Sequence, residues 1–235
     1  MKTIMDKLIV ANWKANLSLP QAEQWLADFG AGYTPHKGIR VVLAVPFPFL
    51  YPLREKLKTL TGISWAAQDV SPYPPGNYTG AVPAAWLNGC VDYALVGHRE
   101  RRRYFHESIQ EVANKISEAL AEDIRPILCV ERDMSRQQAA AVESADLERL
   151  RVAYTPADAE QLEIVRNISV VAEAVRHIGE IFPGCPVLYG GGVNAGNAAE
   201  LLKLPQVAGV MAARGCLDPH SFIQLVRNAA ESTGS

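Results

Sequence analysis

Two polar residues in the stretch VANWKAN have the types and the spacing for chemistry at one site. Asn12 and Lys14 are two positions apart, so in an extended chain their side chains point the same way and that of Trp13 points to the other face. The Asn12 amide can orient an oxygen atom of a ligand, and Lys14 can supply a fixed positive charge. In the simpler interpretation, Lys14 is a surface lysine and Asn12 a turn residue, and these two residues alone do not separate the alternatives.

A histidine directly follows the apolar run YALVG. His98 stands just before the charged segment RERRR, where a helix is expected to begin. A helix N-terminus disfavours the imidazolium ion, and a neutral imidazole can polarise a carbonyl group by hydrogen bonding. A lone histidine more often has a structural role. The charged run from Arg99 to Arg103 is typical of a solvated face or of a set of ion pairs around Glu100.

Two segments nearer the C-terminus have the composition of an anion site. Three consecutive glycines, including Gly191 and Gly192, allow backbone N–H groups to converge just before a predicted helix. Such an arrangement forms a nest for an anion. Ala213 and Arg214 precede a second short turn. The alternative for the glycines is a tight turn with no ligand.

The chain alternates between short apolar runs and longer amphipathic stretches. The strands and helices that these segments form must position the polar residues. The runs are rich in Val, Ile and Leu and lack clean alternation, as is typical of parallel strands buried on both faces. Strands are predicted at residues 8–11, 40–44, 63–67, 93–96, 126–129, 151–154, 186–189 and 207–211. Helices are predicted at residues 20–29, 49–60, 108–122, 160–181, 195–202 and 219–230.

Eight such units in 235 residues predict an α/β protein with a single (β/α)8 barrel domain over residues 1–235, since this fold typically has about 250 residues. A doubly wound sheet is the main alternative, but no Gly-x-Gly-x-x-Gly follows the first strand. In a parallel barrel, the polar residues that follow the strands meet at one face, and the loops after strands seven and eight commonly bind phosphate.

Composition excludes several classes of function. A net charge of −2 gives no indication of nucleic acid or of an anionic membrane surface as a partner. No apolar run reaches the roughly 18 residues of a membrane-spanning helix, and no long apolar region of a secretory signal is present. The four cysteines form no Cys-x-x-Cys pair, so neither a zinc site nor a redox pair is expected, and no metal is predicted. Reduced thiols favour a cytoplasmic protein.

Taken together, these segments resemble the triosephosphate isomerase family. The stretch ANWKAN is similar to the Asn-x-Lys motif of that family, and AQDVSPYPPGNYTGAVPAAWL is similar to its third-loop segment. VDYALVGHRERR resembles its His-x-Glu-Arg-Arg motif, with Arg99 where serine is usual. PILCVE and VLYGGGVN resemble its fifth and seventh strand ends. The resemblance is in register from Lys7 to about Asn228.

This resemblance implies a site, a reaction and an assembly. The reaction is the interconversion of glyceraldehyde 3-phosphate and dihydroxyacetone phosphate, an aldose–ketose isomerisation of glycolysis and gluconeogenesis that needs no cofactor. The partner is a small phosphorylated sugar or a phosphate anion. The implied catalytic residues are Asn12, Lys14, His98 and Glu100. The family also implies a homodimer through SPYPPGNYTG, Ser71 to Gly80, whose two tyrosines and three prolines are costly to leave exposed.

The sequence departs from the family after the sixth strand. The family has Ala-Tyr-Glu-Pro there, where the glutamate is the base, followed by a lid with a Pro-Val-Trp hinge and a glycine-rich tip. This chain has AYTP, so both base and lid are missing. Thr155 is predicted to be an N-cap, with Pro156 first in the helix and Asp158 third. A threonine hydroxyl without an activating partner is no general base near neutral pH.

The proposed phosphate site also departs from the family. Gly192 stands where serine is usual, and Ala213 and Arg214 stand where the family has paired glycines. An alanine with negative φ still offers its backbone N–H group. Arg214 either adds a charged donor or points to solvent.

Three classes of function therefore remain open. One is an isomerase of another small phosphosugar that uses a different carboxylate, for which Glu131, Asp158 and Glu160 are nearest along the chain. The second is a non-catalytic phosphate-ligand-binding or regulatory paralogue. The third is a scaffold defined by its dimer surface, which gives no reason to keep the polar residues of the site. We expect triose phosphate isomerisation to be absent or strongly impaired.

Overall fold

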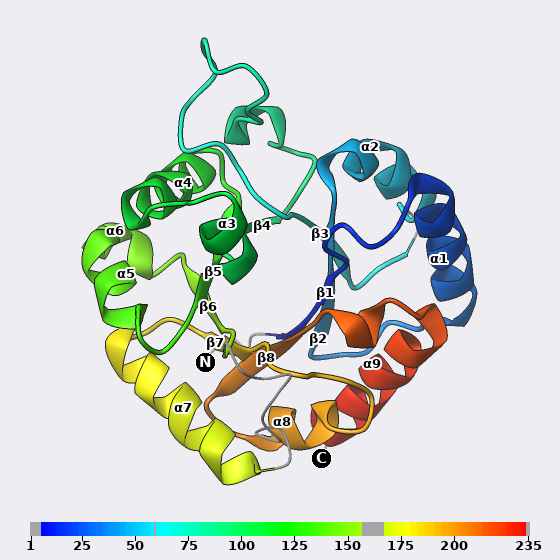
Figure 1. Ribbon diagram of the computed structural model, residues 1–235. Coiled ribbons are helices and arrows are strands. Elements are labelled where there is room, and N and C mark those ends of the chain that lie inside the picture. Colours follow the sequence, from blue (N-terminus) through cyan, green and yellow to red (C-terminus); the bar gives the residue numbers. More distant parts are fainter. Residues whose placement is uncertain (1–5, 59, 157–166, 234–235) are drawn as a thin grey trace.

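The computed structural model describes residues 6–58, 60–156 and 167–233. Eight parallel strands follow one another around a closed barrel, and β1 pairs with β8 to complete the ring. Figure 1 looks along the barrel and shows the helices as an outer ring around the strands. The predicted single (β/α)8 barrel is confirmed, and the doubly wound sheet is excluded.

All eight predicted strands are present, with bounds that agree within one residue at each end. The strands are β1 (Lys7–Asn12), β2 (Ile39–Val45), β3 (Ile63–Ala67), β4 (Tyr93–Val96), β5 (Arg125–Val130), β6 (Arg151–Tyr154), β7 (Val187–Tyr189) and β8 (Val207–Ala212). Their residues are buried almost without exception, because one face of each strand packs inside the barrel and the other packs beneath the helices.

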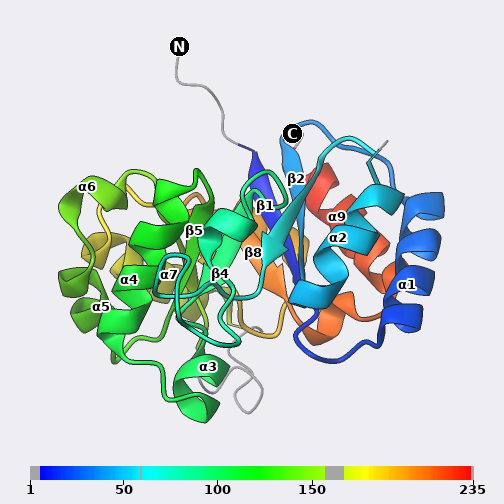
Figure 2. The same ribbon diagram turned by 90° about the horizontal axis from the view of Figure 1, so that it is seen from above.

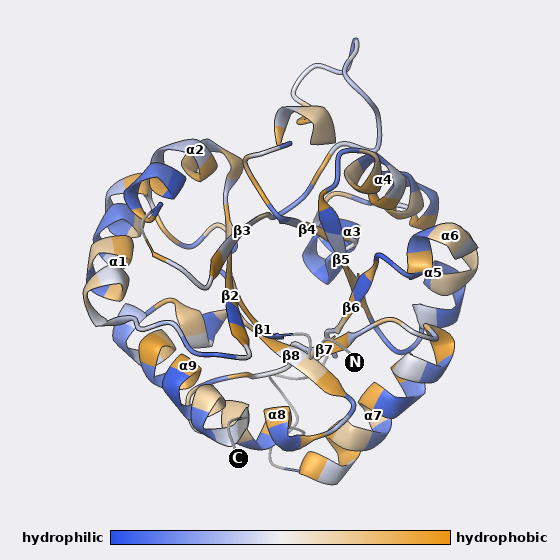
Figure 3. Ribbon diagram, turned by 180° about the vertical axis from the view of Figure 1, so that it is seen from behind, coloured by the Kyte–Doolittle hydropathy of each residue, from blue (hydrophilic) through white to orange (hydrophobic). Residues whose placement is uncertain are grey.

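Two hydrophobic clusters fill these two spaces. Side chains pointing inward pack with one another inside the barrel: Leu8, Val10, Val42, Ala44, Ala66, Tyr93, Leu95, Ile127, Cys129, Ala153, Leu188 and Met211. Side chains pointing outward form a larger cluster with the helices, and it includes the aromatic residues Trp13, Trp25 and Phe29. Figure 3 shows hydrophobic residues along the strands and hydrophilic stretches on the surrounding helices.

The helices agree less closely with the predictions. They are α1 (Leu19–Gly32), α2 (Phe47–Lys56), α3 (Arg99–Tyr104), α4 (Ile109–Ala121), α5 (Ser135–Ala141), α6 (Ser144–Leu147), α7 (Ile168–Ile181), α8 (Ala198–Lys203) and α9 (Pro219–Thr233), with short 3-10 helices η1 (Ala84–Trp86) and η3 (Arg214–Cys216). The predictions missed α5 and α6, which are short and bury few side chains, so they lack the apolar period that identifies a longer amphipathic helix.

Two predicted helix starts were wrong, and a third lies outside the described residues. Helix α2 begins at Phe47 because the prolines at 46 and 48 suit a first helical turn. Helix α8 begins at Ala198, since the side chain of Asn194 accepts from the Gly196 N–H and holds a turn in front of the helix. The predicted helix at 160–181 corresponds to α7, and its portion before residue 167 is not described.

The segment between β3 and β4 projects from the ring of helices (Figure 1). Its base is closed by a hydrogen bond from the Ser71 N–H to the Val82 carbonyl (2.9 Å). Near its tip, the rings of Tyr73 and Tyr78 stack with centroids 4.5 Å apart. Figure 2 views the barrel from the side and shows α3 at the end where the strands finish, which is the end that carries the polar residues.

Two further observations concern membranes and thiols. Within the described part of the chain, every helix is too short or too polar to span a lipid bilayer. All four cysteines are free, and three of them are buried.

Candidate active site

The end of β1 forms a strained turn that carries the first two site residues. Lys14 has φ 53°, in the left-handed region that non-glycine residues seldom adopt. The extended conformation assumed from the sequence is therefore wrong at Lys14, because its N–H donates to Oδ1 of Asn12 (3.1 Å) and closes a turn. Both side chains nevertheless line one cavity. Trp13 points to the outer cluster, as predicted, and packs against Trp25.

Gln68 supports this turn from β3. Its side-chain amide donates to the Lys14 carbonyl (3.0 Å) and to the Ala44 carbonyl at the end of β2 (2.9 Å). These two hydrogen bonds join three strand ends and hold the strained Lys14 backbone in place. Sequence reasoning missed Gln68, although its position directly after a predicted strand was a signal that it faces the site.

His98 is positioned by a glycine turn at the end of β4. Gly97 has φ 63°, and a Cβ there would lie 2.9 Å from the Val112 side chain, so the position requires glycine. His98 is the N-cap of α3, and its Nδ1 accepts from the Glu100 N–H (3.3 Å). An accepting Nδ1 leaves the ring proton on Nε2, and His98 lines the cavity.

The pKa of His98 is lowered to about 4. Burial is the main cause, and the positive charges of Lys14, Arg102 and Arg99 lower it further, while Glu100 raises it. The imidazole is therefore neutral at neutral pH, as the sequence predicted. Its Nδ1 lies 3.6 Å from a Glu100 carboxylate oxygen, a contact that is not an ion pair in this protonation state.

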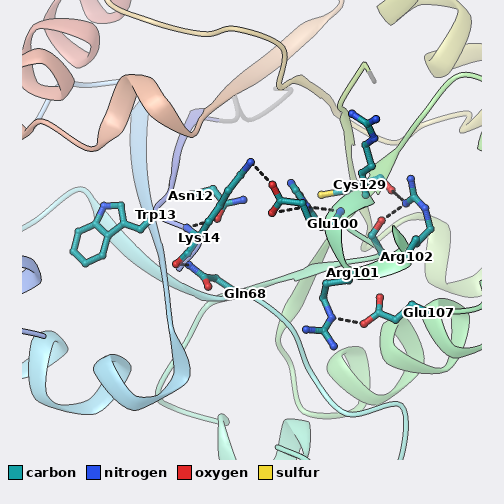
Figure 4. A network of polar contacts seen from close by, with 12 residues as sticks. Asn12, Trp13, Lys14, Gln68, Glu100, Arg101, Arg102, Glu107 and Cys129 are labelled. Atoms are coloured by element: carbon teal, nitrogen blue, oxygen red, sulfur yellow. Dashed lines mark hydrogen bonds and ion pairs between the residues drawn. The ribbon is translucent and has the colours of Figure 1, made fainter. Parts of the chain in front are cut away.

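Glu100 connects the two sides of the site. One carboxylate oxygen lies 2.6 Å from the Lys14 ammonium nitrogen, across the barrel mouth between β1 and α3 (Figure 4). Glu100 also lines the cavity. The structure thus brings Asn12, Lys14, His98 and Glu100 together at the carboxyl ends of the strands.

Two arginines of the charged run fix α3 in position. They form ion pairs, but with Asp69, Glu107 and Glu131, and not around Glu100 as the sequence suggested. The Arg102 side chain is only 7% exposed; it pairs with Glu131 and donates to the carbonyl oxygens of Gly97 and Cys129. Arg101 pairs with Asp69 (2.9 Å) and with Glu107. Figure 4 shows both arginines pointing away from Lys14. Arg102 therefore holds the backbone from which His98 projects.

The proposed anion-binding residues follow β7 and β8. Gly192, Ala213 and Arg214 line the same cavity as His98. Ala213 has a negative φ of −111°, and with a negative φ an alanine can still offer its backbone N–H group to an anion. Gly191 is buried and is not among the described lining residues; a Cβ there would lie 2.6 Å from the Tyr189 hydroxyl oxygen, so its glycine permits close packing.

Thr155 occupies the position that follows β6. Its backbone N–H donates to the Val130 carbonyl (2.9 Å), and its hydroxyl donates to the same oxygen (3.3 Å). Thr155 is buried at the cavity wall. Thr155 and Pro156 are not helical, and the N–H groups that the predicted cap would bind lie outside the described residues. Asp158 and Glu160 also lie outside them.

Glu131 is paired with two arginines and is not among the described lining residues of the cavity. Arg99 reaches one of its carboxylate oxygens (3.2 Å) and Arg102 reaches the other. Of the carboxylates in residues 6–58, 60–156 and 167–233, Glu100 is the only one that lines the cavity. In the same residues, no group of three or more His, Cys, Asp or Glu side chains is arranged to hold a metal ion.

The cavity has a volume of about 570 Å³, which suits a small-molecule ligand. Its lining combines a neutral imidazole, cationic side chains and backbone N–H groups after β7 and β8. The fold and this geometry define the class: a (β/α)8 barrel protein with a cavity of small-molecule size at the carboxyl ends of its strands.

Comparisons with known proteins identify the family. The family model described as triosephosphate isomerase matches residues 7–229. A triosephosphate isomerase from Stenotrophomonas maltophilia (strain K279a) is 34% identical over 249 positions, covering 95% of this chain and 98% of the relative. One from Xylella fastidiosa (strain M12) is 32% identical and covers 94% and 98%. The chain belongs to the triosephosphate isomerase family.

A solved structure shares the fold. The crystal structure of triosephosphate isomerase from Bartonella henselae superposes with a TM-score of 0.77 at 23% identity, covering 95% of this chain and 99% of that one. The 249 positions aligned with the Stenotrophomonas relative exceed the 235 residues of this chain. This chain therefore lacks residues that the relative has.

Proposed function

We propose that this protein binds a small phosphorylated sugar or a phosphate anion in the cavity, and that it interconverts triose phosphates very weakly or not at all. The proposal rests mainly on the identity of the residue that follows β6. Thr155 occupies the position of the family base, and its hydroxyl is bonded to the Val130 carbonyl. Removal of a general base typically costs about 10²–10⁴-fold in rate.

The electrophilic half of the site supports the binding part of this proposal. Neutral His98 can donate from Nε2 to a ligand carbonyl, and Lys14 supplies a fixed positive charge beside it. Backbone N–H groups near Gly192 and Ala213, together with Arg214, are suited to a phosphate group. These groups polarise and bind a ligand but do not remove a proton from its carbon.

An isomerase of another small phosphosugar is the second candidate. It needs a carboxylate at the cavity, and Glu100 is the only one among the lining residues that the structure describes. Glu100 is already engaged by Lys14, and Glu131 by two arginines. A non-catalytic, regulatory role is consistent with the same geometry. In each case the ligand is a phosphorylated small molecule and no cofactor takes part.

The assembly and location that we propose follow the family. We propose a homodimer through the projecting 71–80 segment, a role in or beside glycolysis and gluconeogenesis, and a cytoplasmic location. Exposed aromatic side chains of the connection between β3 and β4 support the dimer: Tyr78, on this segment, is 44% exposed and Trp86 is 67% exposed. Large exposed aromatic side chains are typical of surfaces that dock.

Two measurements test the proposed function. In a coupled assay with glyceraldehyde 3-phosphate, we expect turnover at least about 10²-fold below normal for the family. Titration with glycerol 3-phosphate, followed by calorimetry and by the melting temperature against a chloride control, is expected to show binding and stabilisation by mass action. A normal turnover rate contradicts the loss of the base, and an absence of binding contradicts the phosphate site.

A further inference from the structure

A second cavity lies at the amino ends of the strands, opposite the candidate active site. Its volume is about 570 Å³, and residues at the starts of β1 to β6 line it. Figure 3 views the barrel from this end. None of the described residues that line this cavity belongs to the lining of the candidate active site.

Polar side chains from three adjacent strands point into this cavity. Residues in register on parallel strands face the same side of the sheet. Ser64 is in register with Val42 and Tyr93 with Ala66, and Val42, Ala66 and Tyr93 belong to the cluster inside the barrel. Arg125 is in register with Tyr93, so it faces inward as well. Strands β3, β4 and β5 thus each contribute one polar side chain.

Two buried hydroxyl groups at this wall have no hydrogen-bond partner in the part of the chain that the structure describes. Ser64 is 7% exposed and Tyr93 is 4% exposed, and both line the cavity. A buried polar group without a partner is costly, and most such groups in native proteins are paired. These two hydroxyls therefore require a partner that enters the cavity.

Most charged side chains of the wall already have partners within the protein. They are Asp6, Asp92, Asp123, Arg40 and Arg151. Arg125 differs from them, because no carboxylate within residues 6–58, 60–156 and 167–233 pairs with its exposed side chain. The wall thus offers two hydroxyls and one adjacent cation, without a surplus of positive charge.

We propose that this cavity binds a small hydroxycarboxylate, with its carboxylate against Arg125 and its hydroxyl groups against Ser64 and Tyr93. A carboxylate accepts charge-assisted hydrogen bonds from a guanidinium, and its single charge matches one cation. Hydroxyl groups of the ligand can donate to and accept from those of serine and tyrosine. This site is separate from the phosphate site and does not rest on the proposed function.

Calorimetric titrations compare three probes that carry different parts of the proposed ligand. Glycerate has both a carboxylate and hydroxyl groups, acetate has only the carboxylate, and glycerol has only hydroxyl groups. We expect glycerate to bind about tenfold more tightly than either of the others, because only glycerate reaches both Arg125 and the two hydroxyls. Equal affinity for the three probes, or no binding of glycerate, overturns the site.

Variants locate the site and separate binding from a structural role. Ser64→Ala, Tyr93→Phe and Arg125→Gln are each expected to weaken glycerate binding about three- to tenfold, as the loss of one hydrogen bond implies. Without ligand, Ser64→Ala and Tyr93→Phe should keep or raise the melting temperature, because each removes a buried hydroxyl that has no partner. Ser117→Ala, whose exposed hydroxyl donates to Asp146 (3.3 Å), is the control and should leave the affinity unchanged.

The remaining outcomes are also decisive. Glycerate binding that survives all three variants, or that is lost in Lys14→Met instead, lies elsewhere and overturns the site. A fall in melting temperature with unchanged affinity makes the two hydroxyls structural and overturns it as well. Affinity for glycerol 3-phosphate should stay within about twofold in the three variants, since the two cavities share no described residue. Failure of this inference therefore leaves the proposed function intact.

Discussion

The ammonium nitrogen of Lys14 lies 2.6 Å from a carboxylate oxygen of Glu100 and links the end of β1 to α3 across the barrel mouth. The two side chains are 29% and 41% exposed, so solvent screens the pair and its contribution to stability is small, about 0–1 kcal/mol. Its consequence is positional. It fixes a positive charge beside a neutral imidazole, on a backbone turn held by Gln68.

Replacement of Lys14 is expected to affect phosphate binding much more than the stability of the fold. We expect Lys14→Met to weaken phosphate binding about tenfold or more at low salt, because a charge at the ligand is lost. The free energy of unfolding should change by less than about 1 kcal/mol. Calorimetric titration and urea unfolding measure the two effects. Lys56→Met, which removes a surface pair with Glu23 (2.9 Å), is the control and should change neither; a similar loss of affinity there contradicts a site at Lys14.

The low pKa of His98 predicts a pH dependence of stability. Because its pKa is about 4 in the folded protein and 6.5 in the unfolded reference, the unfolded chain binds more protons between these values. The contribution to stability is complete above pH 6.5 and is lost as the pH falls towards 4. Between pH 7 and pH 5 the loss amounts to about 2 kcal/mol.

The variant His98→Asn tests this dependence. Asparagine keeps a side-chain acceptor for the Glu100 N–H and is a good N-cap, but it does not titrate. Urea unfolding of both proteins at pH 7 and pH 5 should show the additional loss only in the wild type. If the free energy of unfolding falls equally in both proteins between pH 7 and pH 5, His98 is not a buried neutral imidazole.

Restoring the family residue at position 155 should not restore full activity. Thr155 is buried against the wall, and a Cβ on Gly190 would lie only 3.0 Å from its methyl group, so a longer carboxylate has little room. We expect Thr155→Glu to raise kcat/KM for glyceraldehyde 3-phosphate above the wild type and above Thr155→Gln, but to remain well below normal rates. Rates equal to those of the family would show that the missing base alone accounts for the defect.

The projecting loop is expected to hold two copies of the chain together. Sedimentation at micromolar concentration should give the mass of a dimer, and Tyr73→Glu combined with Tyr78→Glu should shift it towards the monomer, because two charges would be buried in the interface. Val170→Glu on α7, on the other side of the ring from the loop (Figure 1), is the matched surface control. A monomeric wild type contradicts the assembly.

The eight strands show how much of the fold can be predicted from local sequence. Each of the eight runs was visible because a parallel strand buried on both faces needs consecutive apolar residues. Helices α5 and α6 were missed, since short helices with small buried faces leave no clear period. The order of the strands then placed His98 and Lys14 at one end of the barrel, as a closed parallel ring requires.

The sequence predicted which polar residues line the cavity, but not the hydrogen bonds that hold them in place. The sequence identified Asn12, Lys14, His98 and Glu100, yet gave no indication that Gln68 would support the Lys14 turn. It also placed Gly191 among the anion-binding residues, whereas the structure buries it beside Tyr189. A residue type and a strand end indicate which side chains face the site, but not which neighbouring strand supplies a hydrogen-bond partner.

By itself, the sequence determined the barrel, the carboxyl-end location of the polar residues and the threonine after β6, because these depend on local composition and on the order of segments along the chain. Only the tertiary structure decided the roles of the arginines after His98. A sequence does not distinguish these four arginines from one another. In the structure Arg101 pairs with Asp69 and Arg102 with Glu131, whereas Arg99 and Arg103 line the cavity and Arg99 also contacts Glu131. Such partners come from distant segments, and their positions exist only once the ring has closed.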